Sequence, residues 1–431
     1  MAEFDVAIIG GGPAGLTAGL YAARANMNAV LFDAKGVGGE ILNTDLIEDY
    51  PGFASITGRE LAEKMAEHAT KFGLKVEIQG VTKVSSDGDR KILEMADGTT
   101  HTAAAVILTV GGEPIKLGVP GEEEFNGKGV SYCAVCDGAF FKGADLAVVG
   151  GGDSAFQEGL FLTRFGKKLY VIHRRSTYRA QAILQERLLS IDMVEPLTPA
   201  TIKEIGGENI VQWMDVDHDG VIKRIPVDGV FIFVGFKPLG RELFEEHIDH
   251  DKDGYILTDS NMRTNIPGVY AAGDCRAQLA RQITTAVGDA TTALLHAERY
   301  IEELKHARKM FPNAPREVVA MSASRMDTLR FAADATIIAE GAAADRLYVI
   351  TQGRVVVTRT GADGAEAEIN RLGPGDYFGE VGLLTGASRN ATVKAATPVE
   401  VLVLNKDTFA TLVQSSQATA NELRMVAETR R

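Results

Sequence analysis

Cysteine is scarce in this chain of 431 residues, which holds only Cys133, Cys136 and Cys275. Small secreted proteins held together by several disulfides contain many more cysteines, so a disulfide framework is excluded. A structural zinc site is excluded as well, because no second Cys or His pair at ligand spacing accompanies Cys133 and Cys136. We therefore expect no bound metal.

Positive charge is also in short supply. The chain has 45 Lys and Arg against 58 Asp and Glu, which gives a net charge of −13. Since nucleic-acid surfaces draw on clustered basic residues, no nucleic-acid partner is expected. Apolar runs of the roughly 18 residues that cross a membrane are missing, and the first residues lack the basic start of a secretory signal. The expected location is the cytoplasm, with no membrane partner.

The sequence does contain a Cys-x-x-Cys pair, Cys133 and Cys136, with Asp137 directly behind it. Two thiols at this spacing can close as a disulfide or open as a dithiol, and a cysteine reacts as its thiolate. A purely structural disulfide is disfavoured, because so short a ring constrains little of the chain and intracellular thiols normally stay reduced. The pair is predicted to be redox-active, whereas Cys275 is expected to be a small packed residue.

A dinucleotide-binding pattern opens the chain: an apolar strand at residues 4–9, a glycine loop, and a helical pattern at 16–24. In such a loop the first glycine makes the turn, the second lets backbone approach a pyrophosphate, and the third allows close helix packing. These positions are Gly10, Gly12 and Gly15. A second strand ends in Asp33, where a carboxylate can accept a ribose 2′-hydroxyl. FAD or NAD is the predicted ligand.

The same pattern recurs after the cysteines, with a strand at residues 145–149 and a loop containing Gly150, Gly152 and Ala155. Its second strand ends in a basic cluster instead of a carboxylate. Guanidinium groups suit a 2′-phosphate through bidentate charged hydrogen bonds, so NADP is the predicted ligand of this unit. The alternative is an exposed basic turn that binds nothing. The cluster comprises His173, Arg174, Arg175 and Arg179.

Residues 1 to about 308 resemble a low-molecular-weight bacterial thioredoxin reductase. The resemblance implies an α/β fold with an FAD domain in two segments, 1–113 and 238–308, and an inserted NADPH domain, 114–237, that carries the cysteines. Both domains would be Rossmann-like. It also implies a homodimer whose partner is thioredoxin or a thioredoxin-like protein. The matching segments, in family order, are 10–15, 49–53, 133–138, 150–155, 173–175 with Arg179, 272–274 and 281–282.

This resemblance also implies roles for single residues. Electrons would pass from NADPH to FAD, then to the Cys133–Cys136 disulfide and on to thioredoxin, with Cys136 facing the flavin and Cys133 attacking the partner. Because the cysteines and the nicotinamide cannot share one flavin face, the NADPH domain must rotate, with hinges expected near residues 111–121 and 235–240. Asp137 would manage the dithiol proton. The implied flavin contacts are Asp274 at the ribitol, with Arg281 and Gln282 beside the ring.

The chain continues past the resemblance to the reductases. Residues 309–318 contain two prolines and are predicted to be a linker. From 319 to 431, short alternating strands separated by glycine-rich turns predict a β-roll with flanking helices.

Residues 378–393 resemble the phosphate-binding cassette of cyclic-nucleotide-binding domains. A helix start at Glu380 offers N–H groups to an anion, and Arg389 can complete the charge pairing. The resemblance assigns Glu380 to the ribose 2′-hydroxyl and Arg389 to the cyclic phosphate, with Gly379 and Asn390 in the same cassette. Threonine after this arginine is associated with cGMP in that family, so Asn390 favours cAMP. The alternative is a degenerate cassette that supports only folding or dimer contacts.

The predicted function is therefore an NADPH-dependent FAD flavoenzyme that reduces thioredoxin and carries a cyclic-nucleotide sensor able to regulate it. One alternative, a flavoprotein that feeds a peroxiredoxin, is disfavoured because the extra N-terminal thioredoxin-like domain is missing. A second, a sensor with vestigial catalysis, is disfavoured by the retained cysteines and glycine loops. A ferredoxin-dependent relative is disfavoured by the arginine cluster.

Overall fold

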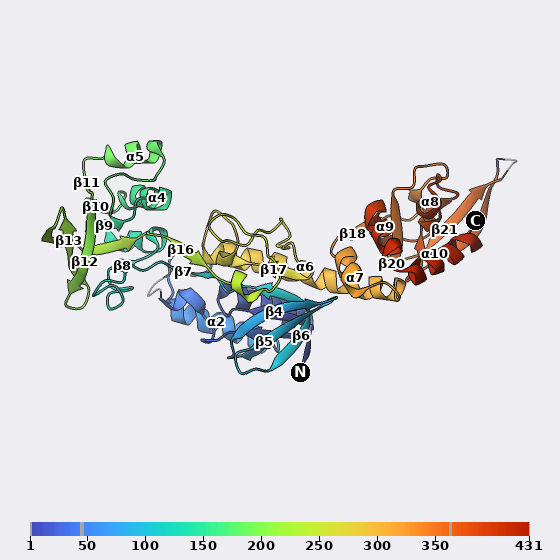
Figure 1. Ribbon diagram of the computed structural model, residues 1–431, viewed down its shortest axis with the longest axis horizontal. Coiled ribbons are helices and arrows are strands. Elements are labelled where there is room, and N and C mark those ends of the chain that lie inside the picture. Colours follow the sequence, from blue (N-terminus) through green and yellow to red (C-terminus); the bar gives the residue numbers. More distant parts are fainter. Residues whose placement is uncertain (1, 44–46, 362–363, 431) are drawn as a thin grey trace.

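The computed structural model describes residues 2–43, 47–361 and 364–430. Three folded units lie in a row (Figure 1). We call them the inserted unit, built on the sheet of β9 (Asp145–Val149), the central unit, built on the sheet of β1 (Glu3–Ile9), and the C-terminal unit, built on the sheets of β20 (Arg346–Gln352) and β21 (Val355–Thr360). The inserted and C-terminal units lie at opposite ends of the molecule.

The central sheet has the order β3-β2-β1-β6-β5-β4, with β17 beside β6. The strands around β1 are parallel, and β4, β5 and β6 form antiparallel neighbours. All residues of β2 are buried, as expected for a parallel strand covered on both faces. The strands are β2 (Ala29–Phe32), β3 (Lys75–Glu77), β4 (Val81–Asp87), β5 (Arg90–Met95), β6 (Thr100–Leu108) and β17 (Val269–Ala271).

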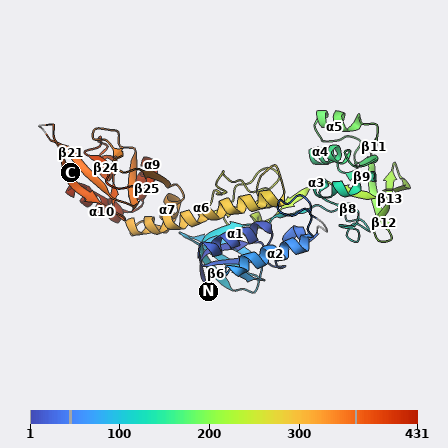
Figure 2. The ribbon, with the colours of Figure 1, turned by 180° about the vertical axis from the view of Figure 1, so that it is seen from behind.

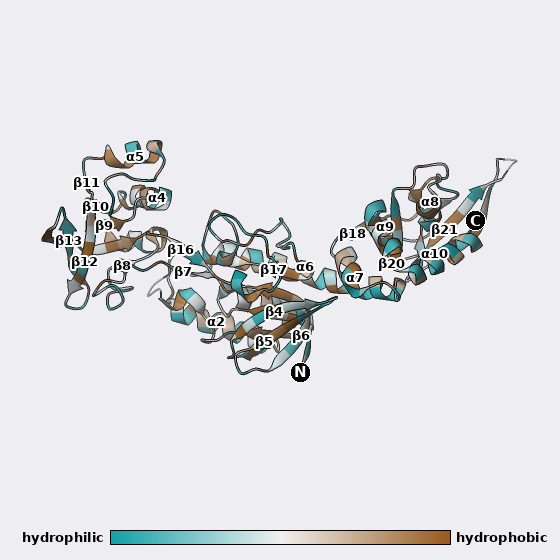
Figure 3. Cartoon of the chain, in the orientation of Figure 1, coloured by the Kyte–Doolittle hydropathy of each residue, from teal (hydrophilic) through white to brown (hydrophobic). Residues whose placement is uncertain are grey.

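Helices cover this sheet. Figure 2 shows α1 (Pro13–Arg24) packed between α2 (Gly58–Lys71) and α6 (Ile283–Met310). Helix α2 begins where the sequence dictates, because the Thr57 side chain accepts a hydrogen bond from the Glu60 amide at 3.1 Å. A short 3-10 turn, η1 (Gly39–Asn43), follows β2. Figure 3 shows hydrophobic residues along the strands of the central sheet, while the visible side of α10 is mainly hydrophilic.

The inserted unit is a parallel sheet of order β11-β10-β9-β15-β8, accompanied by an antiparallel sheet, β12-β13-β14. Helix α4 (Asp153–Leu162) follows β9 directly, which is the strand, loop and helix sequence of a dinucleotide-binding unit. The other elements are β8 (Val130–Ser131), α3 (Ala134–Asp137), η2 (Gly138–Phe141), β10 (Lys168–Ile172), α5 (Ala182–Leu189), β11 (Val194–Leu197), β12 (Ala200–Gly207), β13 (Val211–His218), β14 (Val221–Pro226) and β15 (Gly229–Ile232).

Two short strands connect the inserted unit to the central unit. β7 (Gly112–Pro114) leads into the inserted unit and β16 (Phe236–Pro238) leads out of it, and the two pair antiparallel. A narrow two-stranded connection concentrates any change in backbone angles within a few residues. The chain then passes through η3 (Arg241–Leu243) to β17.

The C-terminal unit has two four-stranded sheets, β18-β25-β20-β23 and β19-β24-β21-β22. Their inner residues form one apolar core that includes Ile350, Val355, Val393 and Val401. The remaining elements are α7 (Arg316–Ala323), β18 (Asp327–Phe331), β19 (Thr336–Ile338), β22 (Glu366–Leu372), β23 (Tyr377–Phe378), α8 (Glu380–Thr385), β24 (Thr392–Ala395), β25 (Val399–Asn405), α9 (Lys406–Ser415) and α10 (Gln417–Thr429).

The segment 309–318, expected to be a linker, is helical at both of its ends. Helix α6 continues to Met310, and α7 begins at Arg316 with Pro315 as its N-cap. Proline is tolerated at a helix start, so its presence did not exclude a second helix there. One apolar cluster runs from α6 through Phe311 and Val319 to Leu404. Among the described residues, none of the helices has the length and apolar composition of a membrane-crossing segment.

Candidate functional site

Cys133 and Cys136 form a disulfide with a Cα–Cα distance of 5.3 Å. Cys133 is the N-cap residue of α3, and its Sγ accepts a hydrogen bond from the Cys136 amide at 3.2 Å. An N–H group that points at a sulfur stabilises the thiolate over the thiol once the disulfide is reduced. The local fold therefore favours negative charge on Cys133 in the reduced pair.

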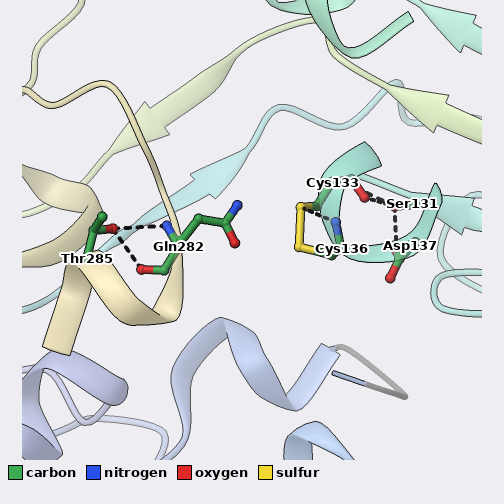
Figure 4. Close-up of a disulfide and its surroundings, with 6 residues drawn as sticks. All are labelled: Ser131, Cys133, Cys136, Asp137, Gln282 and Thr285. Carbon is green, nitrogen blue, oxygen red and sulfur yellow. Dashed lines mark hydrogen bonds between the residues drawn. A yellow bond between two sulfur atoms is a disulfide. The ribbon is translucent and has the colours of Figure 1, made fainter. Parts of the chain in front are cut away.

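A serine connects Asp137 to the cysteine backbone. The Ser131 hydroxyl donates to Asp137 Oδ2 at 2.6 Å, and Ser131 Oγ accepts from the Cys133 amide at 3.1 Å (Figure 4). Ser131 is buried. The carboxyl thus has a fixed position directly after Cys136, from which it can exchange protons with the reduced pair. Ser131 stands two residues before Cys133, but nothing in the sequence singled it out as a partner of Asp137.

The disulfide faces the central unit. Figure 4 shows Gln282 projecting from the start of α6 toward the two sulfur atoms. The Gln282 amide donates to Thr285 Oγ1 at 3.2 Å, and the Thr285 hydroxyl donates to the Gln282 carbonyl at 2.9 Å, which fixes this helix start. The neighbouring Arg281 guanidinium lies 4.4 Å from the centre of the Tyr255 ring. The structure thus brings the start of α6, with Gln282 as its N-cap, to face the cysteines.

The first glycine loop leaves space for a group outside the chain. Gly10 has a φ of 109°, and a Cβ there would lie 2.5 Å from the Thr109 carbonyl oxygen, so the fold itself requires this glycine. Gly12 differs, because its φ is −72° and the nearest atom to an added Cβ is 4.0 Å away. Neither backbone angle nor packing requires glycine at position 12, so the open space fits a phosphate that approaches the backbone.

Asp33 organises this loop. Its Oδ2 accepts from the Gly11 amide at 2.6 Å, and its Oδ1 accepts from the Lys35 and Gly36 amides at 2.7 and 3.0 Å. A carboxylate offers about four lone-pair directions, so a ribose hydroxyl can still donate to it. Gly15 completes the loop, since a Cβ there would collide with the Gly10 carbonyl oxygen.

Asp274 lies in η4 (Gly273–Cys275), after β17. Burial raises the pKa of Asp274 to about 6, while Arg281 opposes this shift. A polar ligand that donates hydrogen bonds would favour the ionised carboxylate. Next to it, burial raises the pKa of the fully buried Cys275 thiol to about 12, which keeps that thiol protonated and inert.

The second glycine loop repeats the contrast of the first. Gly150 has a φ of 153°, and an added Cβ would lie 2.4 Å from the Phe233 carbonyl oxygen. Gly152 has a φ of −103°, and no atom lies within 4 Å of an added Cβ. Ala155 is fully buried beneath the loop. The space beside Gly152 therefore also fits an external phosphate.

The basic cluster follows β10. The side chains of Arg174, Arg175 and Arg179 are exposed, and within the described ranges none of these three guanidinium groups forms an ion pair. The Arg179 and Ala180 amides donate to the Gly151 carbonyl at 2.7 and 3.0 Å. The backbone of the cluster is thereby fixed against the glycine loop while the guanidinium groups remain available to an anion.

His173 takes a different position from the arginines. Its side chain is only 7% exposed, and an added Cβ at Gly151 would lie 2.3 Å from its ring. Burial, together with the neighbouring arginines, lowers the pKa of His173. The ring therefore packs beneath the loop, where the lowered pKa favours its neutral form, and its role toward NADPH stays a prediction.

A buried carboxylate that the sequence did not reveal connects residues 117–118 to the cysteine loop. Glu122 is 1% exposed; its Oε1 accepts from the Leu117 amide at 2.8 Å and from the Tyr132 hydroxyl at 2.9 Å, and its Oε2 accepts from the Gly118 amide at 2.6 Å. Tyr132 directly precedes Cys133. Glu122 sits among other glutamates at positions 122–124, so no sequence signal separates it from its exposed neighbours.

The nucleotide cassette is satisfied by the chain itself. Arg389 is 5% exposed and donates to the Gly379 carbonyl at 2.7 Å, to the Arg346 carbonyl at 2.8 Å and to Asp345 Oδ1 at 3.3 Å. Gly379 has a φ of 90°, and a Cβ there would lie 2.6 Å from Arg389 Nη1, so only glycine fits.

Glu380, the first residue of α8, is 1% exposed and pairs with Arg430 at 3.0 Å. Arg430 Nη1 also donates to the Tyr377 carbonyl at 2.7 Å. The Asn390 amide reaches the Arg430 carbonyl at 3.4 Å. Arg430 follows α10, and the sequence gives no sign of its contact with Glu380, because an arginine at a helix end is usually a solvated charge.

Comparison with known proteins covers both parts of the chain. The pyridine nucleotide-disulphide oxidoreductase family matches residues 4–290, and the cyclic nucleotide-binding domain matches residues 328–416. A thioredoxin reductase of Listeria innocua is 47% identical over 307 residues, covering 70% of this chain and 96% of that protein. A thioredoxin reductase of Bacillus subtilis is 46% identical and covers 71% of this chain and 97% of its own length.

Solved structures agree with these matches. Thioredoxin reductase from Streptococcus pyogenes is 45% identical, with a TM-score of 0.67, and covers 70% of this chain and 99% of its own. The Lactococcus lactis enzyme, described as being in the FR conformation, is 41% identical with a TM-score of 0.50 and the same coverage. The predicted α/β class, with Rossmann-like units and a C-terminal cyclic-nucleotide-binding type β-roll, is confirmed.

Proposed function

The chain belongs to the thioredoxin reductases of the pyridine nucleotide-disulphide oxidoreductase family, and from this premise we propose how its residues act and how it is regulated. It is a thioredoxin-disulfide reductase, an FAD-containing and NADPH-dependent enzyme, with a C-terminal cyclic nucleotide-binding domain. The observation that carries this reading is the Cys133–Cys136 disulfide, placed opposite Gln282 at the start of α6. The relatives give no support to a peroxiredoxin-feeding enzyme or to a sensor without catalysis.

The open spaces at Gly12 and Gly152 fit the two dinucleotides. Bound FAD would supply the redox chemistry, by accepting a hydride from NADPH and delivering two electrons to a disulfide. The proposed FAD contacts are Gly10, Gly12, Gly15, Asp33, Asp274, Arg281 and Gln282. The proposed NADPH contacts are Gly150, Gly152, Arg174, Arg175 and Arg179, with Ala155 and His173 supporting the loop.

In the reduced enzyme, the Cys133 thiolate attacks one sulfur of the thioredoxin disulfide, and the other thioredoxin sulfur leaves as a thiolate. Cys136 then attacks Cys133, which re-forms the enzyme disulfide and releases the second thioredoxin sulfur. Thioredoxin gains two electrons and two protons, and Asp137, held by Ser131, passes a proton between the dithiol and the solvent.

We propose that the inserted unit turns about β7 and β16 between two positions, one with the disulfide at the flavin and one with the nicotinamide there. A difference between relatives supports this motion. The Streptococcus pyogenes and Lactococcus lactis enzymes cover equal parts of this chain at similar identity, yet their TM-scores are 0.67 and 0.50. Equal coverage with unequal superposition is expected when the same units are placed differently.

The finer assignments follow the same premise. We propose an FAD domain at 1–113 and 238–308, an NADPH domain at 114–237, a linker region at 309–318 and the nucleotide-binding domain at 319–431. The substrate is thioredoxin or a thioredoxin-like protein, and the enzyme is a homodimer in the cytoplasm. In the cassette, Glu380 would accept from the ribose 2′-hydroxyl and Arg389 would bind the cyclic phosphate, with cAMP preferred over cGMP.

The test is NADPH oxidation by FAD-loaded protein with added thioredoxin, in the presence and absence of cAMP or cGMP. We expect Cys133→Ser and Cys136→Ser to lose thioredoxin reduction by about 10³-fold or more, as removal of a covalent nucleophile does, while NADPH still bleaches the flavin. Thioredoxin reduction that persists in both variants would contradict the reductase mechanism. Turnover that ignores both nucleotides would contradict the regulatory part alone.

A further inference from the structure

The carboxylate assigned to the nucleotide ribose already has a partner in the chain. Glu380 Oε1 lies 3.0 Å from Arg430 Nη1, and the Glu380 side chain is only 2% exposed. Arg430 is held in turn by the Tyr377 carbonyl, at 2.7 Å, and its guanidinium lies 5.1 Å from the centre of the Tyr377 ring. A buried carboxylate needs such a charged donor, because burial without one is costly.

The end of α10 is fixed to the cassette by a further contact. The Asn390 side chain donates to the Arg430 carbonyl at 3.4 Å. Asn390 directly follows Arg389, so Arg430 touches the cassette on both sides of the proposed ligand position, at Glu380 and beside the phosphate-binding arginine. A hydroxyl of a bound ribose would have to reach the same carboxylate that this guanidinium now holds.

We propose that Arg430 is a tethered competitor of the cyclic nucleotide. Its guanidinium occupies Glu380 in place of a ribose hydroxyl, and a nucleotide binds only when Arg430 leaves. This inference rests on the proposed nucleotide-binding function of the cassette. Arg430, which lies far from the cassette in sequence, thereby sets the affinity of the cassette for the nucleotide.

Displacement of Arg430 would release the end of α10, and that helix packs toward the reductase. Leu423 of α10 belongs to the same apolar cluster as Phe409 of α9, Val319 of α7 and Ala307 of α6. Asn313, between α6 and α7, reaches Glu422 of α10 at 3.4 Å. A ligand can shift the helix only by its differential affinity for the two positions, and Arg430 supplies that difference.

The experiment is calorimetric titration of the FAD-loaded protein, residues 1–431, with cAMP and, separately, with cGMP. The variants are Arg430→Ala and Arg430→Gln, and the matched control is Arg424→Ala, because Arg424 is exposed on the same helix. Loss of one charged hydrogen bond from the competitor corresponds to about a tenfold or greater gain in nucleotide affinity. We expect that gain in Arg430→Ala, a smaller gain in Arg430→Gln, and none in Arg424→Ala. Arg430→Gln keeps a donor for Glu380, which guards against loss of folding.

Equal affinity in the wild type and both Arg430 variants would overturn the competitor role while leaving nucleotide binding in place. Weaker binding in the Arg430 variants would also overturn it, since Arg430 would then be a ligand contact. If no variant binds either nucleotide although hydrogen exchange shows β20 and β24 folded, the proposed function of the cassette itself fails. Glu380→Ala, added to Arg430→Ala, should remove the gain if Glu380 is where the two compete.

Discussion

Arginines at two sites in this molecule are expected to bind phosphate, and they differ in exposure and in whether they already have partners within the chain. Arg174, Arg175 and Arg179 are exposed and, in the described chain, form no ion pairs. Arg389 is 5% exposed and donates to two carbonyl groups of its own chain. The same chemical logic identified both groups from the sequence. In the structure, Arg174, Arg175 and Arg179, which we call the open cluster, are available to a ligand. Arg389 instead forms hydrogen bonds that already stabilise the fold.

The largest effect is expected from substitutions in the open cluster. In the double variant Arg174→Ala with Arg175→Ala, two charged hydrogen bonds to the 2′-phosphate are lost, each worth about 1.5–3 kcal/mol. We expect kcat/KM for NADPH to fall about 10²-fold or more, measured by flavin reduction, while kcat/KM for NADH stays unchanged. Equal losses with both nucleotides would mean that the cluster does not read the 2′-phosphate.

The matched substitution, at Arg389, should lower the stability of the C-terminal unit before it affects anything else. Arg389→Ala leaves the Gly379 and Arg346 carbonyls without their buried donor, which costs about 2–4 kcal/mol. Hydrogen exchange of β20 and β24 should report that loss, whereas Arg174→Ala should leave exchange in β9 and β10 unchanged. Unaltered protection in Arg389→Ala would show that the arginine is held for a ligand and not for the fold.

The sequence supported the fold well where patterns are local. The strand predicted at 145–149 matches β9 at both ends, because an apolar β-branched run bounded by turns leaves little choice. Helix α7 was missed, since two prolines suggested a linker where Pro315 in fact begins a helix.

The site was readable to the extent that it is made of neighbours in sequence. Cys133, Cys136 and Asp137 stand in one short stretch, and so do Glu380 and Arg389. The contacts that decide whether each group is free come from distant segments, such as Arg430 at Glu380, 50 positions away. Pairings of this kind depend on tertiary packing, so a single sequence carries no signal for them.

A smaller effect is expected at Glu122, a buried carboxylate that holds the segment before Cys133 in place. Glu122→Gln replaces an oxygen with an amino group that faces an N–H donor of Leu117 or Gly118, and an unsatisfied buried donor costs about 1–3 kcal/mol. We expect lower protection of the β7 to β8 segment in hydrogen exchange and slower thioredoxin reduction. The control is Glu123→Gln, whose exposed pair with Lys116 should contribute little. Equal behaviour of the two variants would contradict the role assigned to Glu122.

His173 differs from the open cluster beside it, because His173 is buried whereas the three arginines are exposed. Burial, aided by Arg175, Arg179 and Arg174, lowers the pKa of His173 in the folded chain below its ordinary value near 6.5. Below that value the unfolded chain takes up a proton that the folded chain resists, so His173 lowers stability as the pH falls and has no such effect above it.

Replacing His173 with glutamine should therefore reduce the loss of stability between pH 7.5 and pH 5.5. The measurement is hydrogen exchange in β9 and β10 at the two pH values, corrected for intrinsic exchange, in the wild type and in His173→Gln. We expect this to be the smallest of the four predicted effects, because only one partly buried side chain changes its protonation. The groups that face this side chain are the three arginines and Tyr178. The NADPH preference should survive, because the 2′-phosphate is read by guanidinium groups. A wild type that becomes more stable on acidification relative to the variant would mean that His173 is charged in the fold and belongs with the ligand-binding arginines.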